Sequence, residues 1–467
     1  MTTRLNTNDL KRKVKGTVIV PADAAYEDAR RVWNAMIDRR PAVIVRCSEA
    51  ADVSAAIAFA RDNGLEISVR GGGHHIAGLS VCDGCLMIDL SGMKDVRVDA
   101  GARIARVQPG VTLRDFDQAV QAHGLATPVG INSTTGIAGL TLGGGFGWLT
   151  REYGMTVDNL AAADVVIADG RTLRASAKDN PDLFWAIRGG GGNFGVVTEF
   201  EFKLHPVGPN VFAGLIVFPL KEAKKVLSAY RGFVKSAPPK LNVWAVMRQA
   251  PPLPFLPEGA HGKEVVILAV FYNGDASEGE RLILPLRGFG TVIGEHVGSM
   301  PYVQWQQAFD QLLTPGARNY WKSHNFTELS EPVLDAMVES AGKLPSPECE
   351  IFVGLLAGAA NDVLPGATAY GARDARFVAN VHSRWRSPQE DDRCVRWARG
   401  FFDTVAPYAS AGAYTNFMTA DEGERVEAAY GANYARLREI KRRYDPENIF
   451  HLNQNIRTSE QAGNRKG

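Results

Sequence analysis

Cysteine is scarce in this chain, and long apolar runs and an excess of either charge are missing. Only five of the 467 residues are cysteine, an odd and sparse set that favours free thiols in a reducing cytoplasm over a disulfide framework. No stretch of about 18 apolar residues occurs, so the sequence predicts no membrane span. Lysine and arginine number 52 against 51 aspartate and glutamate, which argues against nucleic acid or an anionic membrane as a partner.

The remaining bulk properties are those of an ordinary globular protein. Hydrophobic residues make up 45% and charged residues 22%, and the length suits two domains, or three. The segment from Met1 to Lys15 is polar and lacks the apolar core of a secretory signal. We therefore expect a cytoplasmic protein, a monomer or homodimer, that acts on a small organic molecule.

Several familiar catalytic motifs are absent or incomplete. Cys82 and Cys85 have the spacing of a redox motif or of half a zinc site, but no second pair exists and an apolar strand follows them. We interpret them as free thiols. The nine histidines show no paired ligand spacing, so we expect no metal site. Neither a G-x-S-x-G elbow nor a P-loop occurs.

The hydrophobic pattern divides the chain into three parts with an α+β architecture. Up to residue 206, short strands alternate with helices; strands are expected at 43–45, 66–69, 86–90, 104–107, 163–168, 173–175 and 196–202, and helices at 51–63, 113–123 and 179–188. Residues 207–410 are expected to form an antiparallel sheet flanked by helices, with strands at 212–218, 243–248, 265–272, 351–356 and 377–382, and helices at 222–236 and 331–340. The last part, 411–457, contains a helical stretch at 423–443, and 458–467 is expected to be a flexible tail.

Three glycine-dense loops lie within the first 200 residues, at 71–73, 136–147 and 189–195. The second is too glycine-rich for a stable helix. The third matches G-x-G-x-x-G, but a helix precedes it and a strand follows, which is the wrong context for a Rossmann fingerprint. Glycine lets backbone amides approach a phosphate closely. One glycine triplet is more often only a turn, whereas three such loops favour an extended dinucleotide lying across them.

Four segments, in this order along the chain, resemble the covalent flavoprotein oxidases of the berberine-bridge-enzyme-like family, which have a vanillyl-alcohol-oxidase (PCMH-type) FAD fold. They are Arg70–His74 (RGGGH), Gly139–Gly147 (GLTLGGGFG), Asp182–Gly191 (DLFWAIRGGG) and Tyr444–Asn455 (YDPENIFHLNQN). The resemblance implies a PCMH-type FAD domain of two subdomains at 1–206, with its core at 37–206. A substrate domain at 207–410 would cover the flavin, and 411–457 would return to the FAD domain.

The resemblance also implies which residues hold FAD. His74 matches the histidine that bonds to the 8α-methyl group of the flavin. Many members add a second bond from a cysteine, but that position is Asn132 here, so a single covalent bond is implied. The implied cofactor-binding residues are Arg70, Gly71, Gly72, Gly73, His74, His75, Gly78, Gly130, Ser133, Thr134, Thr135, Gly136, Gly139, Gly144, Gly195, Val197, Asn453 and Asn455.

Two residues are catalytic candidates. Tyr414, which from its local sequence is a half-buried strand tyrosine, matches a position where family members carry a tyrosine base. Two further positions with tyrosine in some relatives are Phe146 and Phe417 here. A tyrosine base needs a neighbouring charge that lowers its pKa from about 10. Glu350 is the second candidate, on a predicted strand of the substrate domain.

The expected activity is oxidation of a small alcohol, amine or phenolic, polyketide-like molecule by hydride transfer to flavin N5. Thr135 matches the position that controls oxygen access in the family and is small, which favours O2 as the acceptor and H2O2 as the product. The apolar strands of the substrate domain favour an aromatic substrate over a sugar. The alternatives are a flavin-dependent oxygenase, a dehydrogenase with another acceptor, and a flavin-binding protein without turnover.

Overall fold

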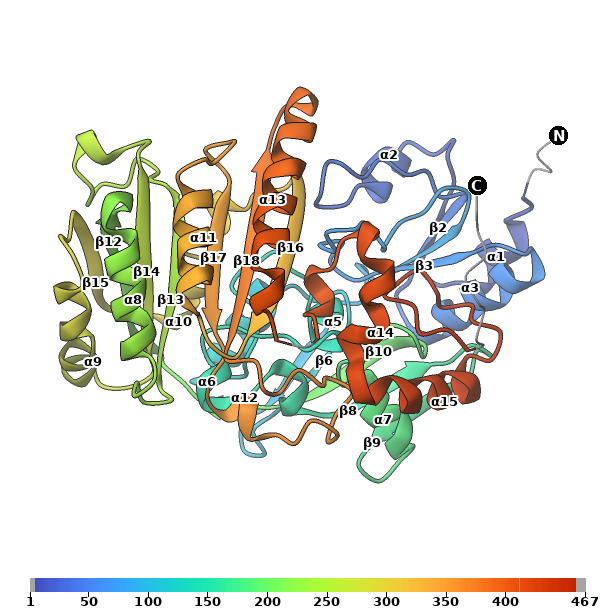
Figure 1. Ribbon diagram of the computed structural model, residues 1–467. Coiled ribbons are helices and arrows are strands. Elements are labelled where there is room, and N and C mark those ends of the chain that lie inside the picture. Colours follow the sequence, from blue (N-terminus) through green and yellow to red (C-terminus); the bar gives the residue numbers. More distant parts are fainter. Residues whose placement is uncertain (1–4, 411, 459–467) are drawn as a thin grey trace.

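The computed structural model, drawn in Figure 1, describes residues 5–410 and 412–458. The N-terminal half contains two main sheets. The first has the order β1-β2-β4-β3 and the second the order β5-β6-β10-β8-β9. Their bounds are β1 Thr17–Ile19, β2 Val43–Arg46, β3 Ile67–Arg70, β4 Leu86–Asp89, β5 Val96–Asp99, β6 Ile104–Val107, β8 Leu160–Val166, β9 Thr172–Ser176 and β10 Val196–Lys203. A short pair, β7 Leu125–Ala126 and β11 His205–Pro206, leads out of this half.

The N-terminal half also contains α-helices. They are α1 Asn8–Lys13, α2 Tyr26–Arg30, α3 Ala50–Asp62, α4 Leu113–Gln121, α5 Ile137–Leu142, α6 Thr150–Tyr153 and α7 Pro181–Ile187. Asp52 holds the start of α3, because its carboxylate accepts hydrogen bonds from the backbone N–H groups of Lys15, Gly16 and Ser48. The parallel pairing of β3 with β4 ends at Arg70, where the first glycine loop begins.

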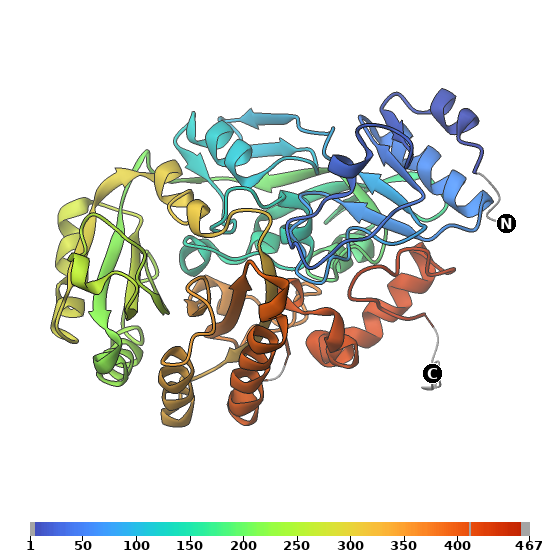
Figure 2. The ribbon, with the colours of Figure 1, turned by 90° about the horizontal axis from the view of Figure 1, so that it is seen from above.

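The segment 207–410, which the sequence predicts to be a substrate domain, is built on one seven-stranded antiparallel sheet of order β15-β12-β14-β13-β17-β18-β16. The strands are β12 Asn210–Pro219, β13 Leu241–Gln249, β14 Glu264–Tyr272, β15 Gly294–Pro301, β16 Arg318–Phe326, β17 Glu350–Leu355 and β18 Phe377–Trp385. The helices α8 Ala223–Phe233, α11 Glu331–Ala341 and α13 Asp391–Val405 cover the face of the sheet away from the N-terminal half (Figures 1 and 2). The other face is therefore left to meet the glycine loops. The shorter helices α9 Ala276–Ile283, α10 Tyr302–Gln306 and α12 Ala359–Asp362 lie in the connections.

The C-terminal segment returns to the N-terminal half and completes its core. Met418, Leu437 and Ile456 belong to the same buried cluster as strand residues of the second sheet. Within this segment the expected helix 423–443 is broken into α14 Val426–Tyr430 and α15 Tyr434–Tyr444. The break falls at Gly431, whose φ of +52° is a left-handed conformation that ends a helix.

Two further expectations are corrected by the structure. Residues 137–142 of the second glycine loop form the helix α5, which buries Ile137 and Ala138 in the core; burial outweighs the poor helix propensity of its one internal glycine. Cys82 and Cys85 form a disulfide across the turn before β4, with their Cα atoms 5.7 Å apart, and are not free thiols. The other three cysteines are buried and unpaired.

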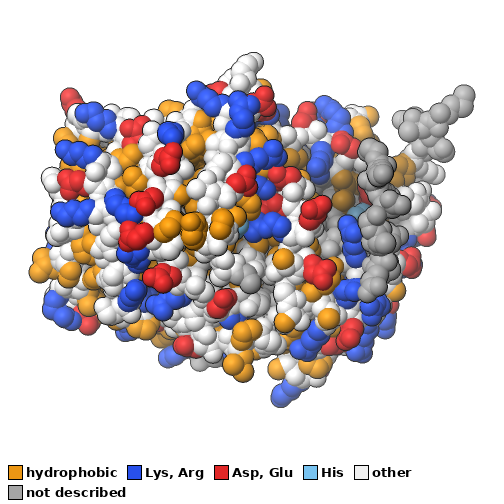
Figure 3. Space-filling view, viewed as in Figure 1, with side chains coloured by type: hydrophobic (Ala, Val, Ile, Leu, Met, Phe, Trp, Pro, Cys, Tyr) orange, Lys and Arg blue, Asp and Glu red, His pale blue; other side chains and the backbone are white. Residues whose placement is uncertain are grey.

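Basic and acidic side chains are interspersed on the face shown in Figure 3, with no large region of one sign. Many of them pair, as Lys224 does with Glu331. Among the described residues, no helix is both long and apolar enough to cross a bilayer. Residues 459–467 of the expected tail lie outside the described part of the chain.

Candidate active site

A cavity of about 470 Å³ lies between the glycine loops and the uncovered face of the seven-stranded sheet. It has two halves of different chemistry. The first half is lined by residues 71–75, 130–132, 135, 136, 138, 139, 191, 192 and 195–197, and by the C-terminal segment around Asn453. The second half is lined by side chains of β12, β13, β14, β16, β17 and β18, and by residues 308, 309 and 311–313.

The first half is built by backbone that passes close to backbone. A Cβ atom on Gly72 would lie 2.3 Å from the backbone nitrogen of Gly136, and one on Gly136 would lie 2.3 Å from that of Gly72. The first and second glycine loops can therefore touch only because both residues are glycine. A Cβ on Gly139 or Gly192 would meet no protein atom within 4 Å. Both residues line the cavity, so the space beside them is open to a ligand.

The same loops offer hydrogen-bond donors without a protein acceptor. Within residues 5–410 and 412–458, none of the backbone N–H groups of residues 71–75 donates to another protein group. All five residues line the cavity, so their free N–H groups are available to a polar ligand bound there. The amide oxygens of Asn453 and Asn455 are buried without a partner in the described chain, and of the two residues only Asn453 lines the cavity. These donors and acceptors fit the phosphates and the ring edges of FAD.

A buried ion pair brings the C-terminal segment to this wall. Lys441 Nζ lies 2.6 Å from Asp445 Oδ2 and donates to the carbonyl oxygens of Asn193 and Phe450. Both side chains are fully buried. Asp445 also accepts from the backbone N–H groups of Ile449 and Phe450. The third glycine loop and the residues before Asn453 are thus held by one cation.

His74 stands at the junction of the two halves. Its Nε2 atom lies 3.0 Å from the hydroxyl of Thr134, and its ring stacks on Trp33 with the centroids 5.1 Å apart. Burial lowers the pKa of His74 to about 4, so the ring is neutral at pH 7. Burial lowers the pKa of His75 to about 4 as well, and its Nδ1 accepts from the N–H of Ala77.

The other expected cofactor residues divide into two groups. Gly71, Gly72, Gly73, His75, Gly130, Thr135, Gly136, Gly139, Gly195, Val197 and Asn453 line the cavity with His74. Arg70, Gly78, Ser133, Thr134, Gly144 and Asn455 do not. Arg70 donates to Asp89 and to the carbonyl oxygen of Arg31, which fixes the end of β3. Ser133 donates to Asp310 of the substrate domain, so its contact is between domains.

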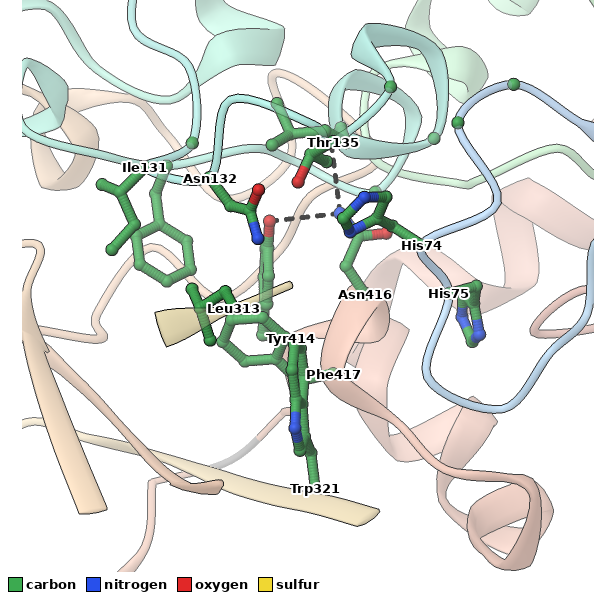
Figure 4. Close-up of a pocket in the computed structure, with 18 of the residues that line it drawn as sticks. His74, His75, Ile131, Asn132, Thr135, Leu313, Trp321, Tyr414, Asn416 and Phe417 are labelled. Carbon is green, nitrogen blue, oxygen red and sulfur yellow. Dashed lines mark hydrogen bonds between the residues drawn. The ribbon is translucent and has the colours of Figure 1, made fainter. Parts of the chain in front are cut away.

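Tyr414 lies between the two halves, as Figure 4 shows, and it precedes a short 3-10 turn, so it is not in a strand. It is 4% exposed rather than half-buried. Its hydroxyl oxygen accepts from the N–H of Gly145 and from Asn416 Nδ2. Burial raises the pKa of Tyr414 to about 12. The hydroxyl therefore keeps its proton at pH 7 and has both acceptor positions filled, which leaves it a donor toward the cavity.

Glu350 belongs to a charged network on the sheet. Arg248 Nη1 lies 2.7 Å from Glu350 Oε2, and His382 Nδ1 lies 3.2 Å from Glu350 Oε1. Burial alone would raise the pKa of Glu350, but Arg248 and His382 lower it to about 2. Glu350 is thus a carboxylate that accepts from His382 Nδ1–H. Burial lowers the pKa of His382, and its Nε2 is buried with no partner in the described chain.

The rest of the second half is aromatic. Phe417 meets Tyr414 at a centroid distance of 4.8 Å, and Trp321 at 5.7 Å. Trp244 stacks on Phe352 from the neighbouring strand β17. In Figure 4, Trp321 and Phe417 are drawn below His74 and Asn132. This half can hold a flat apolar molecule whose polar end reaches the network of Arg248, Glu350 and His382.

Arg248, His382 and Trp33 carried no signal in the sequence, whereas Glu350 was already a candidate. Arg248, Glu350 and His382 come from three different strands, and the pairing of Arg248 with Glu350 and of Glu350 with His382 exists only in the sheet register. Trp33 belongs to an N-terminal segment that crosses to the substrate domain, where its indole N–H donates to the carbonyl oxygen of Leu313.

Together these features define a class of protein, an oxidoreductase that holds a dinucleotide along glycine loops and a small substrate against a sheet. Comparison with known proteins agrees. One family model, described as FAD binding domain, matches residues 41–176, and another, described as berberine and berberine like, matches residues 413–457. The chain belongs to the berberine-bridge-enzyme-like FAD-linked oxidoreductases of the PCMH type, and its cofactor is FAD. The α+β fold expected from the sequence is confirmed.

The similarity extends over nearly the whole chain. The sequence is 32% identical to (R)-6-hydroxynicotine oxidase of Paenarthrobacter nicotinovorans, covering 95% of this chain and 97% of that protein. It is 31% identical to an FAD-linked oxidoreductase of Dictyostelium discoideum, covering 96% of each. The crystal structure of 6-hydroxy-D-nicotine oxidase from Arthrobacter nicotinovorans superposes with a TM-score of 0.86 at 28% identity, covering 98% of this chain and 100% of that one. The structure of xylooligosaccharide oxidase from Myceliophthora thermophila superposes with a TM-score of 0.84 at 26% identity, covering 97% of this chain and 98% of that one.

Proposed function

We propose that this protein is an oxidase with FAD bonded to His74, that its substrate is an aromatic amine, alcohol or phenol, and that O2 is the electron acceptor. The position of His74 carries the proposal. Its ring is neutral, lines the cavity, and lies where the glycine loops meet the substrate half. FAD, when bound, supplies the hydride acceptor at N5. Thr135, beside His74 on the cavity wall, is small enough to leave room for O2.

The chain's own residues divide the remaining work. The aromatic side chains of Trp244, Phe352 and Phe417 hold the substrate ring and exclude water. Tyr414 donates a hydrogen bond to a substrate oxygen or nitrogen. Glu350 acts through His382: its carboxylate accepts Nδ1–H, so Nε2 of His382 presents a lone pair to the proton that the substrate loses. These roles replace the simpler expectation of a tyrosinate base.

The composition of the substrate half supports an aromatic substrate. Its polar groups gather at one end, in Arg248, Glu350 and His382, and most of the other lining side chains are apolar. An oligosaccharide exposes hydroxyl groups along its whole length and needs hydrogen-bond partners along its whole length. A flat amine or phenol needs them at one end.

Acid precipitation of the purified protein tests the attachment, with His74→Ala as the variant and His75→Ala as the matched control. We expect the yellow colour to stay with the wild-type and His75→Ala pellets and to wash out of His74→Ala. Colour that washes out of the wild type contradicts the covalent bond. A panel of aromatic amines, phenols and oligosaccharides, assayed for H2O2 release, then tests the substrate class; a response to oligosaccharides alone contradicts it.

Use of 18O2 separates the remaining alternatives. An oxidase delivers the label to H2O2 and none to the organic product, whereas an oxygenase incorporates it. In a dehydrogenase, substrate would bleach the flavin absorbance in the absence of air, and the absorbance would return only slowly when O2 is admitted.

A further inference from the structure

The side chains of Asn132, Thr134 and His74 form a chain of hydrogen bonds in which each donor can be assigned. The backbone N–H of Thr134 lies 3.1 Å from Asn132 Oδ1, the hydroxyl of Thr134 lies 2.8 Å from the same oxygen, and that hydroxyl lies 3.0 Å from His74 Nε2. Asn132 is the position that the family resemblance matches to a second attachment cysteine. It cannot form that bond, yet it is tied to His74 through one intervening residue.

Which atom donates in each of these hydrogen bonds follows from which atoms carry a proton. A backbone N–H can only donate, so the atom of Asn132 that it meets is the carbonyl oxygen and not the amide nitrogen. That oxygen has no proton to give, so the single hydroxyl proton of Thr134 points to it. The hydroxyl oxygen then has only lone pairs to offer His74, and Nε2 of His74 must carry the proton.

We infer that Asn132 and Thr134 hold His74 in the tautomer that is protonated at Nε2 and has its free lone pair at Nδ1, and that this lone pair makes the bond to the flavin. The inference rests on the proposed attachment at His74 and names the residues that prepare it. Burial keeps the ring neutral, so the tautomer, and not a change of charge, decides which nitrogen is nucleophilic. Trp33, stacked on the ring, restrains its rotation.

Attachment would exchange a C–H bond of FAD for a C–N bond to His74. A bond forms between Nδ1 and the 8α carbon of FAD, and one C–H bond of that methyl group breaks. The hydrogen leaves as a proton, and its bonding electron pair passes to the flavin ring. The proton on Nε2 leaves as well, with the Thr134 oxygen as the nearest acceptor. O2 takes the two electrons and two protons, giving H2O2 and an oxidised, attached flavin.

The ratio of acid-stable flavin to total bound flavin, measured on purified full-length protein, tests the inference. Asn132→Ala frees the Thr134 hydroxyl to donate to Nε2, which favours the opposite tautomer, and Thr134→Val removes the contact. At the same time after induction, we expect both ratios to fall on the order of tenfold, the scale of one hydrogen bond, while total flavin changes little. A residue that only supported the fold would lower total flavin and leave the ratio unchanged.

Two conservative variants complete the test. Thr134→Ser keeps the hydroxyl, and Asn132→Asp, assayed at pH 8, keeps an acceptor oxygen; both should retain the wild-type ratio. Wild-type ratios in Asn132→Ala and Thr134→Val, including any measured on residual flavin, overturn the inference. A ratio as low in Asn132→Asp as in Asn132→Ala overturns it too. If the wild type itself releases all its flavin in acid, the attachment fails and the inference fails with it, a result distinct from covalent wild type with unaffected variants.

Discussion

At the scale of single residues, burial and hydrogen-bond geometry redistribute the roles that side-chain identity suggests. Tyr414 is the case where they matter most, because its raised pKa and its two donors, Gly145 and Asn416, make it a hydrogen-bond donor. We expect Tyr414→Phe to lower kcat about 10- to 100-fold, the cost of a lost hydrogen bond to the reacting group. The pH profile between 6 and 9 should keep its shape. An alkaline limb near neutral pH that disappears in Tyr414→Phe would show a tyrosinate base instead.

The contact of Glu350 with His382 predicts how activity depends on pH. His382 must be neutral to accept a proton, so activity should fall as pH drops through its pKa, which lies below 6.5. Glu350 raises that pKa, since its negative charge favours the imidazolium. Glu350→Gln should therefore move the acidic limb to lower pH. It should also lower kcat on the order of 100-fold, because an amide whose oxygen accepts from Arg248 presents its NH2 group to Nδ1 of His382 and favours the wrong tautomer. A kcat/KM profile whose acidic limb stays in place contradicts the assignment. Glu348→Gln, on a neighbouring pair with Arg384, is the control.

At the scale of elements, glycine serves two purposes in the glycine loops: it lets two backbone segments touch, and it leaves space in the cavity. Gly72→Ala places a Cβ against the backbone of Gly136, so it should destabilise the protein and loosen both loops. Gly139→Ala meets no protein atom, and as a helix-interior change it should stabilise the flavin-free protein by about 1 kcal/mol. Its Cβ enters the cavity where we propose that the cofactor binds, so total bound flavin should fall. Thermal unfolding and flavin absorbance measure the two effects; unchanged flavin content in Gly139→Ala would contradict a cofactor beside α5.

The sequence predicts best those helices and strands whose stability depends on their own residues and not on tertiary contacts. The strands β13 and β14 are apolar runs, and they were predicted to within two residues. The strand β16, Arg318–Phe326, was missed because it is mostly polar, and it buries Lys322 and Asn325 through the fold around it. The helix α5 was missed because its stability comes from tertiary packing. The motif residues of the cofactor half were found because glycine and histidine carry their own signal, whereas the pairing of Arg248, Glu350 and His382 depends on register.

At the scale of the whole molecule, the two domains meet at a buried acid. Asp117 on α4 accepts a hydrogen bond of 3.0 Å from Gln306 on α10, and its second oxygen has no partner in the described chain. Burial raises the pKa of Asp117 to about 7. Because the folded pKa exceeds the unfolded value of about 3.9, stability is fully present below pH 4 and is lost as pH rises to 7, by roughly 4 kcal/mol from this group.

Asp117→Asn should remove that loss, since the amide keeps the shape and carries no charge. Denaturant unfolding at pH 5 and pH 8 should show the variant gaining stability over the wild type as pH rises. Asp115→Asn, at an exposed position on the same helix, is the matched control. An equal difference between Asp117→Asn and wild type at both pH values would mean that the carboxyl is already ionised at pH 5.

The return of the C-terminal segment to the first domain has a consequence for how the protein is made. Lys441 anchors, and Asn453 lines, a cavity wall whose other side is translated more than 200 residues earlier. A nascent chain still on the ribosome therefore has only part of a flavin site, however well its earlier segments have folded. Cofactor capture must wait until synthesis of the last helix and the residues beyond it is complete. Prematurely terminated chains should therefore contain no flavin and be colourless, so the yellow colour indicates that synthesis of the full chain is complete.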